Sequence, residues 1–254
     1  MSTRLDNHLV TLGLVPTRAR AADAIARGCV RVDGVIATKA GQKVADGAAV
    51  ALQDPASAYV SRAALKLVAG LDLAGLDVSG RECLDVGAST GGFTQVLLER
   101  GAVRVTALDV GTDQLHASLR DDPRVVELKA NARDLVADML PGPPSLAVCD
   151  VSFISLRLAM PPALDAVTPG GRCVLLVKPQ FEIGRGGVGK GGVVDPAEAE
   201  RVAGAMRDWL DGRPGWRSTH LAPSPIHGGD GNREWLLIGA RHEDADHRGP
   251  EPRR

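Results

Sequence analysis

The sequence is poor in aromatic residues and contains no long apolar run. Only 3% of its 254 residues are Phe, Trp or Tyr, so we expect a core built from Ala, Val and Leu. An RNA-binding sheet that stacks bases on several aromatic rings is disfavoured for the same reason. No apolar stretch approaches the roughly 20 residues that a membrane-spanning helix needs, so none is predicted.

Cysteine and net charge are also scarce. The four cysteines have no C-x-x-C spacing, and three of them lie in apolar runs typical of strands, so we expect buried, reduced thiols. The net charge is −1, but residues 1–50 carry seven Lys and Arg against four Asp and Glu. This surplus makes nucleic acid a candidate partner of the N-terminal segment. The first residues lack the apolar core of a signal peptide, so we expect a cytoplasmic protein.

Two domains are predicted, covering residues 1–54 and 59–240. Residues 4–27 have the pattern of two short helices, the second capped by Thr17. An Asp33-Gly34 pair between two short β runs favours a type I′ hairpin. The turn-rich residues 55–58 form the expected linker. The charged and proline-containing residues 241–254 are expected to be a disordered tail.

The larger domain has the alternating pattern of an α/β, Rossmann-like fold with a mostly parallel sheet. Short apolar runs alternate with helical segments of about ten residues. The expected strands are residues 82–86, 103–109, 124–128, 146–150, 172–178, 216–222 and 234–240. The stretch between the last two is too short for a crossover helix, so the last of the seven strands is predicted to be antiparallel.

A glycine-rich turn follows the first of these strands and opens a helix, in the order Asp85-Val86-Gly87-Ala88-Ser89-Thr90-Gly91-Gly92-Phe93. Glycine lets a ligand approach the backbone, and the helix N-terminus offers free N–H groups. Ser89 replaces the second glycine of the dinucleotide pattern, which argues against a bound pyrophosphate. Asp109 ends the next strand, where a carboxylate can accept from both hydroxyls of a ribose. The combination predicts S-adenosylmethionine; glycines that only turn a strand into a helix are the structural alternative.

Two further polar residues, Asp150 and Lys178, stand at the ends of apolar strands. Ligands of open parallel sheets bind outside the carboxyl ends of the strands, so both side chains should face the same crevice. Lys66, on a helix predicted over residues 61–71, and Glu234, at the start of the last strand, are each more typical of a solvated charge when taken alone.

The glycine-rich residues 184–191 resemble a phosphate-binding loop. Gly191, however, stands where such a loop has the Ser or Thr that binds magnesium. We therefore expect a mobile flap beside the site, or a passive surface loop, and no nucleotide hydrolysis.

The N-terminal domain resembles S4-type RNA-binding domains in Arg4-Leu5-Asp6 and in residues 17–25 and 27–34. Its basic side chains can follow a phosphate backbone, whereas a scatter of solvated charges is the alternative. The expected RNA contacts are Arg4, Arg18, Arg20, Arg27 and Lys39.

The remainder resembles the TlyA family of ribosomal RNA 2′-O-ribose methyltransferases, once called haemolysins, whose catalytic domain is similar to that of the FtsJ/RrmJ enzymes. The stretches that carry the resemblance are residues 59–62, 65–67, 83–94, 150–156, 178–182, 188–194 and 223–226. The sequence departs from the family pattern at Ala63-Ala64, where two glycines are usual.

The resemblance implies transfer of a methyl group from S-adenosylmethionine to the ribose 2′-hydroxyl of cytidine in 16S or 23S ribosomal RNA, or in ribosomal subunits, with no metal and no membrane. The implied catalytic set falls on Lys66, Asp150, Lys178 and Glu234. The expected cofactor contacts are Asp85, Gly87, Ala88, Ser89, Gly91, Gly92, Phe93, Asp109, Asn131, Ala132 and Asp150.

Attack by a ribose hydroxyl needs a base or strong hydrogen-bond acceptor, so Lys178 would have to be without its proton to serve. Two other functions stay open at this point. An NAD-dependent oxidoreductase could use the same turn and Asp109, although Ser89 and the lack of an obvious hydride-transfer acid speak against it. A membrane-active haemolysin would need a helix with a strongly basic face and a bulky apolar face, which we do not find.

Overall fold

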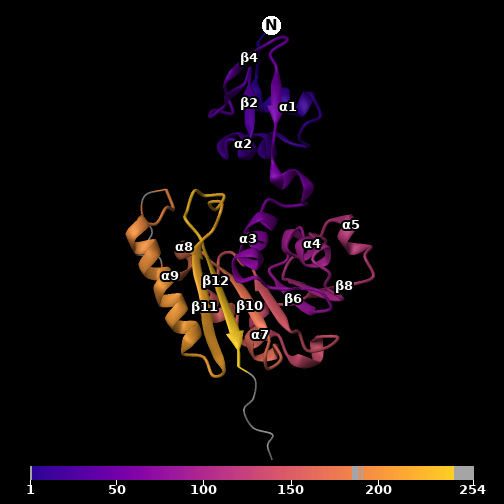
Figure 1. The fold of residues 1–254 in the computed structure, drawn as a ribbon, viewed down its shortest axis with the longest axis vertical. Helices are drawn as coiled ribbons and strands as arrows, with labels where there is room; N and C mark the ends of the chain where they lie inside the picture. Colours follow the sequence, from indigo (N-terminus) through magenta and orange to yellow (C-terminus); the bar gives the residue numbers. More distant parts are fainter. Residues whose placement is uncertain (1, 185–188, 190, 243–254) are drawn as a thin grey trace, which may run out of the picture. The chain divides into compact units, whose positions relative to one another are not determined.

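The computed structural model describes residues 2–184, 189 and 191–242. The chain forms two compact units, Met1–Ala58 and Tyr59–Arg254, called unit 1 and unit 2 below (Figure 1). Unit 1 contains β1 (Ser2–Arg4), α1 (Leu5–Thr11), α2 (Arg18–Ala26), β2 (Val30–Val32), β3 (Val35–Ile36), β4 (Lys43–Ala45), β5 (Val50–Leu52) and the 3-10 helix η1 (Pro55–Ala58).

Unit 1 packs its two helices around a small aliphatic core that includes Leu5, Leu9 and Ile25. The predicted cap of α2 is confirmed, because the Thr17 side chain accepts a hydrogen bond from the backbone N–H of Arg20. The hairpin between β2 and β3 is confirmed as well: Asp33 and Gly34 have φ of 49° and 81°, as a type I′ turn requires.

Three strands of unit 1 were not predicted. β1 pairs antiparallel with β4, and β5 pairs antiparallel with β2. Each has only three residues, which is too short for an alternation of apolar and polar side chains to show in the sequence. These strands depend on their neighbours for their conformation.

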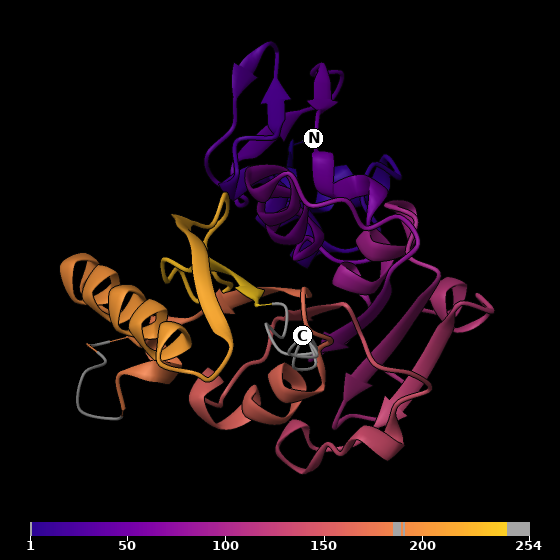
Figure 2. The ribbon, with the colours of Figure 1, turned by 60° about the horizontal axis from the view of Figure 1, so that its bottom comes forward.

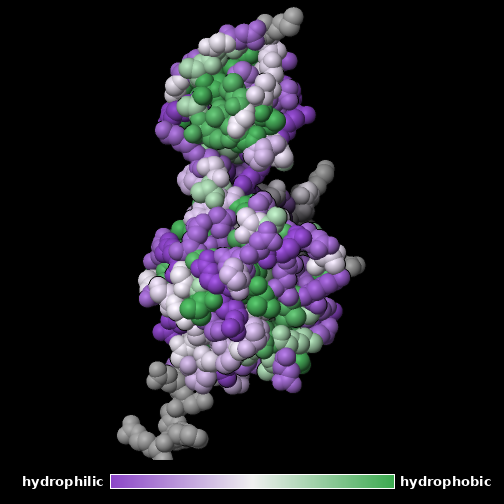
Figure 3. Space-filling view, turned by 90° about the vertical axis from the view of Figure 1, so that its right-hand side faces the viewer, coloured by the Kyte–Doolittle hydropathy of each residue, from purple (hydrophilic) through white to green (hydrophobic). Residues whose placement is uncertain are grey.

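The surface of unit 1 is partly apolar. Figure 3 shows apolar residues gathered on the face of unit 1 drawn there, whereas the face of unit 2 in that view mixes polar and apolar residues. The large apolar side chains exposed in unit 1 are Leu12, Leu14, Val35 and Ile36.

Unit 2 contains one seven-stranded sheet and its helices. The strands are β6 (Glu82–Val86), β7 (Arg104–Asp109), β8 (Val125–Lys129), β9 (Leu146–Cys149), β10 (Arg172–Val177), β11 (Trp216–Pro223) and β12 (Trp235–Arg241), in the spatial order β11-β12-β10-β9-β6-β7-β8. The helices are α3 (Ala64–Ala74), α4 (Gly92–Glu99), α5 (Ala117–Arg120), η2 (Ala132–Asp134), η3 (Ala137–Met139), α6 (Leu156–Ala159), α7 (Pro161–Ala166), α8 (Pro179–Glu182) and α9 (Pro196–Asp211).

The sheet is parallel except for β12, which runs antiparallel to both β10 and β11. The predicted fold is therefore confirmed, including the antiparallel last strand. β10 shows how the sheet is buried on both faces: Cys173, Leu175 and Val177 pack with α6, α7 and α9, whereas Val174 packs with α3 and α4. In Figures 1 and 2, α9 lies along β11 and β12.

Several boundaries differ from the prediction. The helix expected from residue 61 begins at Ala64, because the Ser61 hydroxyl accepts from the backbone N–H of Ala63 and holds a turn there. The crossovers on either side of β8 hold only α5, η2 and η3 instead of helices of about ten residues. Arg241, expected to lie in the tail, belongs to β12, and residues 243–254 of the expected tail lie outside the described residues.

Candidate active site

The register of β10 and β12 brings two of the predicted catalytic residues together. Val177 is paired with Trp235 in this antiparallel ladder. Lys178 follows Val177 and Glu234 precedes Trp235, so Lys178 and Glu234 lie at the same edge of the sheet. Asp150 joins them there, because it follows the parallel strand β9 on the other side of β10.

Two close ion pairs result. The Lys178 ammonium lies 2.6 Å from Asp150 Oδ1, and it donates a hydrogen bond of 2.8 Å to Ser152 Oγ. The Lys66 ammonium, carried by α3, lies 2.5 Å from Glu234 Oε2. All four side chains are at least 85% buried, and a buried ion needs a partner of opposite charge to offset its desolvation.

The two carboxylates are enclosed together with their lysines. Asp150 Oδ1 and Glu234 Oε2 are buried and make no aligned hydrogen bond within the described residues, although each lies within ion-pair distance of its lysine. Burial raises the pKa of Glu234 above its ordinary value, against the opposing effect of Lys66. Each carboxylate is therefore held against its lysine, which offsets the cost of burying the charge.

Lys66, Lys178 and Glu234 line a cavity of about 480 Å³, called the catalytic cavity below. Its lining residues are Lys66, Ser152, Phe153, Lys178, Gln180, Phe181, Gly192, Gly229, Asp230 and Glu234. Phe153 is 90% exposed and has φ of 65°, a strained value for a bulky residue. Its ring centroid lies 5.2 Å from that of Phe181. The cavity therefore offers an exposed aromatic face beside the two lysines.

A second cavity of about 520 Å³, called the cofactor cavity below, adjoins the first at Ser152 and Phe153. Its lining includes the predicted cofactor contacts Gly87, Ser89, Asp109, Asn131, Ala132 and Asp150. The predicted contacts Ala88, Gly92 and Phe93 line a smaller recess that also reaches Asp150, Ser152 and Lys178. The volume of the cofactor cavity suits a nucleoside-sized ligand.

Asp109 is held in place by the backbone around it. Its carboxylate oxygens accept from Ser89 N and Gly111 N, each at 2.8 Å. Ser89 has φ of 48°, and this left-handed conformation directs its N–H toward the carboxylate. Each oxygen retains a lone pair, so the carboxylate can accept from the two hydroxyls of a ribose.

Gly87 is required by its protein neighbours. A Cβ at this position would lie 2.9 Å from Val151 Cγ1 and 3.2 Å from the carbonyl carbon of Asp150. The glycine therefore lets the segment after β9 pass close to the turn after β6, which brings Asp150 to the cofactor cavity.

Two predicted cofactor contacts lie behind the cavity wall. Asp85 is fully buried, and its Oδ2 accepts a 2.7 Å hydrogen bond from Thr94 Oγ1. Burial raises the pKa of Asp85 to about 7. Gly91 faces Leu115 and Leu119, which a Cβ would meet at 2.7 and 2.3 Å. Neither residue lines the cavities described above.

Ser152, Phe153, Gln180 and Asp230 line the catalytic cavity but were not predicted as site residues. The first three follow the carboxyl ends of β9 and β10 within a few residues, so the rule that located Asp150 and Lys178 could have included them. Asp230 carries no such signal, because it lies in an irregular segment before β12.

The basic residues expected to contact RNA differ in their surroundings. Arg4 and Arg18 both pair with the buried Asp6, at 2.8 and 3.1 Å, and the bonds from Arg4 contribute most to holding the pKa of that carboxyl well below its usual range. Lys39 is exposed.

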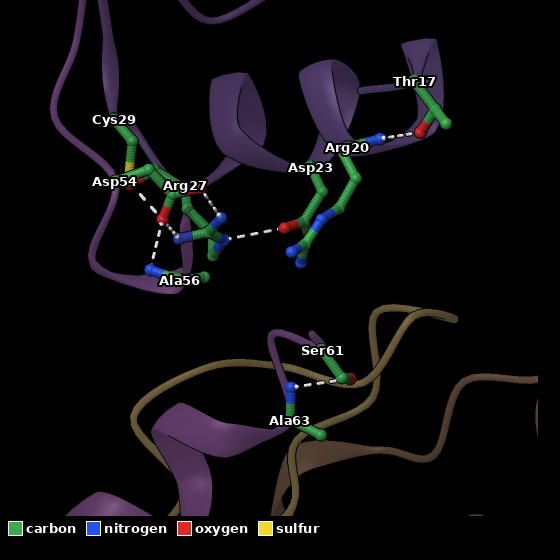
Figure 4. A network of polar contacts seen from close by, with 9 residues as sticks. All are labelled: Thr17, Arg20, Asp23, Arg27, Cys29, Asp54, Ala56, Ser61 and Ala63. Atoms are coloured by element: carbon green, nitrogen blue, oxygen red, sulfur yellow. Dashed lines mark hydrogen bonds and ion pairs between the residues drawn. The ribbon is translucent and has the colours of Figure 1, made fainter. Parts of the chain in front are cut away.

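Arg27 is largely enclosed by acidic partners. Its side chain is 13% exposed and bonds Asp54 at 2.7 Å and Asp23 at 2.9 Å. Figure 4 shows this bridge, together with the bonds from Ala56 N to Asp54 and from Arg20 N to Thr17. The Arg27 guanidinium links Asp23 on α2 to Asp54 near the end of unit 1, so Arg27 has a structural role there.

Within residues 2–184, 189 and 191–242, no helix is long and apolar enough to cross a bilayer. The same residues contain no group of three or more His, Cys, Asp or Glu side chains that could hold a metal ion. Most of the glycine-rich segment expected to form a flap, residues 185–188 and 190, lies outside the described part of the chain.

Residues 59–241 match the model of the FtsJ-like methyltransferase family, and residues 3–50 match that of the S4 domain. The chain belongs to the FtsJ-like methyltransferase family. The resemblance inferred from the sequence motifs is thus confirmed, and membership favours methyl transfer over the oxidoreductase alternative.

Individual relatives agree with this assignment. The chain is 47% identical to the 16S/23S rRNA (cytidine-2′-O)-methyltransferase TlyA of Mycobacterium tuberculosis, over 92% of this chain and 88% of the relative. It is 40% identical to Hemolysin A of Brachyspira hyodysenteriae, over 92% and 98% of the two chains. A Streptococcus thermophilus structure described as that of a hemolysin superposes with a TM-score of 0.72 at 38% identity, covering 96% of this chain and 91% of that one.

Proposed function

We propose that this methyltransferase transfers a methyl group from S-adenosylmethionine to the 2′-hydroxyl of a cytidine in ribosomal RNA. The observation that carries the proposal is the pair of buried lysine–carboxylate contacts at the edge of the sheet, 2.6 Å for Lys178 with Asp150 and 2.5 Å for Lys66 with Glu234. The catalytic cavity and the cofactor cavity meet beside these contacts. The relatives that act on cytidine in ribosomal RNA supply the substrate class.

S-adenosylmethionine, when bound, supplies a methyl group activated by a positively charged sulfur. Asp109 would hold the two ribose hydroxyls of its adenosyl group, and Asn131 and Ala132 line the cofactor cavity where the base would lie. Gly87 and Ser89 would contact the remainder, because both line that cavity next to Asp150.

Lys178 is the residue best placed to accept the proton of the attacking hydroxyl. It lines the recess that connects to the cofactor turn as well as the catalytic cavity. An ammonium group cannot accept, so Nζ must first release a proton, and Asp150 Oδ1 is the nearest group that can take it. The hydrogen bond to Ser152 holds Nζ in position.

Lys66 has a different role. Its ammonium is carried by α3, is paired with Glu234 and lines the catalytic cavity, to which it supplies positive charge. This charge favours the developing alkoxide of the ribose hydroxyl. Glu234 keeps the lysine in place through their ion pair. Holding oxygen and methyl group in line supplies several kcal/mol more.

RNA recognition is assigned to unit 1 together with the catalytic cavity. Unit 1 matches the S4 domain and carries exposed basic side chains such as Lys39 and Arg31. In unit 2, the exposed ring of Phe153 offers a face on which an unstacked base can lie.

The proposal is tested by incubating the purified protein with unmethylated ribosomal subunits and methyl-labelled S-adenosylmethionine. We expect label in ribosomal RNA at a cytidine ribose, located by mapping 2′-O-methyl positions, and a labelling rate lower by about a hundredfold or more with Lys178→Ala. Label on a base, on protein, or on no RNA would refute the proposed function.

A further inference from the structure

An acidic residue and an amide face the catalytic cavity in addition to Lys66, Lys178 and Glu234. Gln180, on α8, donates from Nε2 to Asp230 Oδ2 at 3.0 Å, and both residues line the cavity with Phe153 and Lys178. An exposed carboxylate at a cavity that receives RNA repels phosphate groups. Its presence therefore points to contact with a group of the opposite character, a hydrogen-bond donor on a base.

The orientation of the Gln180 amide is determined by its partner. The Asp230 carboxylate can only accept hydrogen bonds. Burial raises its pKa, but the hydrogen bonds from Asn232 and Gln180 together lower the pKa by more, so the net shift is downward. The amide nitrogen must therefore point to the carboxylate. Gln180 Oε1 is then buried without a partner among the described residues. Flipping the amide would bring two acceptors together, so the unsatisfied oxygen persists.

The segment that carries Asp230 is held by hydrogen bonds that Asn232 makes. Asn232 is 1% exposed, and its side chain donates to Gly192 O and accepts from Val194 N, both at 2.9 Å. Asp230 Oδ1 accepts from the backbone N–H of Asn232 at 3.0 Å. The same segment leads directly to Glu234, so the pair is held at a set distance from the catalytic residues.

We propose that Asp230 and Gln180 read the Watson–Crick edge of the target cytosine, an inference that rests on the proposed function. The Asp230 carboxylate accepts from the exocyclic amine N4, and the second N–H of Gln180 Nε2 donates to the ring nitrogen N3. Asp and Glu are suited to accept from cytosine N4. The face of the base lies against Phe153, whose ring is exposed at the same cavity.

Uracil reverses both contacts. It presents the acceptor O4 to the carboxylate and the donor N3–H to the amide N–H. The first reversed contact places two acceptors against one another, and the second places two donors. Polar groups that are buried without a partner are costly, and this cost lets a site reject a close analogue strongly. The pair therefore selects cytidine over uridine without any contact to the ribose.

The test uses ribosomal subunits in which the mapped cytidine is retained or replaced by uridine, with single-turnover rates measured for both. We expect the full-length protein to methylate cytidine about a hundredfold or more faster than uridine. Asp230→Asn can turn an amide N–H toward O4, so its rate on uridine should rise and its preference should fall to below about tenfold. Gln180→Leu should lose the preference by slowing the cytidine reaction.

Asp138→Asn is the matched control, because it removes an equal charge at a position in η3 that lines neither the catalytic nor the cofactor cavity. The preference of this variant for cytidine should equal that of the unmodified protein.

Equal rates on cytidine and uridine with the unmodified protein would overturn the inference while the proposed function stands. The inference also falls if Asp230→Asn and Gln180→Leu slow both substrates in equal proportion. Absence of any ribose methylation by the unmodified protein would instead refute the proposed function, and this inference with it.

Discussion

Lys178 is the residue on which the proposed chemistry depends most. Its ammonium is buried between Asp150 and Ser152, and Ser152 lines both cavities. Lys178→Ala should lower the single-turnover methylation rate by about a hundredfold or more, the usual size of a lost general base. Binding of S-adenosylhomocysteine, measured by calorimetry, should stay near that of the unmodified protein.

Lys178→Arg separates the two roles of the lysine. Arginine keeps the positive charge but does not give up its proton near neutral pH, so we expect a rate nearly as low as that of the alanine variant. An arginine variant that retains most of the rate would show that Lys178 only positions the substrate. The proton would then leave through Asp150, Glu234 or water.

Asp85 should make the stability of unit 2 depend on pH. Burial raises its pKa to about 7 in the folded chain, whereas an unfolded chain has a value of about 3.9. Between these values the folded state holds a proton that the unfolded state has lost. The free energy of unfolding therefore falls as pH rises from 4 to 7, by up to about 1.4 kcal/mol per pH unit, and is level above that range.

Asp85→Asn should remove this contribution while keeping an acceptor for Thr94. All three tryptophans of the chain lie in unit 2, so denaturant unfolding followed by tryptophan fluorescence reports that unit. We expect the variant to gain stability relative to the unmodified protein as pH rises from 5 to 7. Parallel curves for the two proteins would show that Asp85 does not titrate in this range.

At the scale of elements, the seating of α3 on the sheet positions Lys66. Gly70 lies one turn beyond Lys66, and a Cβ there would come within 2.9 Å of Val174 Cγ1 on β10. Val174 is fully buried and β-branched, so it cannot turn away. Gly70→Ala should destabilise unit 2 by about 1–2 kcal/mol in denaturant unfolding and slow methylation.

Gly204→Ala provides the matched comparison. This glycine lies inside α9 and has no atom within 4 Å of an added Cβ. The substitution should stabilise the unit by about 0.5–1 kcal/mol, because alanine favours the helix. If both substitutions change the stability in the same direction, the close approach of α3 to β10 does not exclude a side chain at position 70.

For the whole molecule, the proposal assigns RNA binding and chemistry to different units. Deleting unit 1 should abolish methylation of ribosomal subunits and leave cofactor binding largely intact, because both cavities are lined by unit 2 alone. Normal methylation by the shortened chain would contradict a role of unit 1 in recognition.

Charge reversal in unit 1 tests the same role without a deletion. Arg18 pairs with the buried Asp6, so reversing it would disturb the fold. Lys39→Glu and Arg31→Glu avoid this, since both side chains are exposed. They should weaken RNA binding for all sequences and reduce its salt dependence, measured by titration at several salt concentrations. An unchanged salt slope would place the phosphate contacts elsewhere.

Local patterns in the sequence predicted the fold class and half of the proposed catalytic set. Alternating apolar runs predicted the seven strands, and polar residues at strand ends predicted that Asp109, Asp150 and Lys178 face one crevice. Both inferences succeed because the direction of a side chain along a strand, and the position of a strand's carboxyl end, follow from the backbone itself.

Tertiary structure alone decided which charges meet. Lys66 and Glu234 are far apart in the sequence and pair only because α3 packs on β10 and β12. Long-range packing also encloses Arg27, buries Asp85 behind the cavity wall and joins Gln180 to Asp230. The burial and partners of a polar side chain depend on elements that are distant along the chain, so its own segment does not determine them.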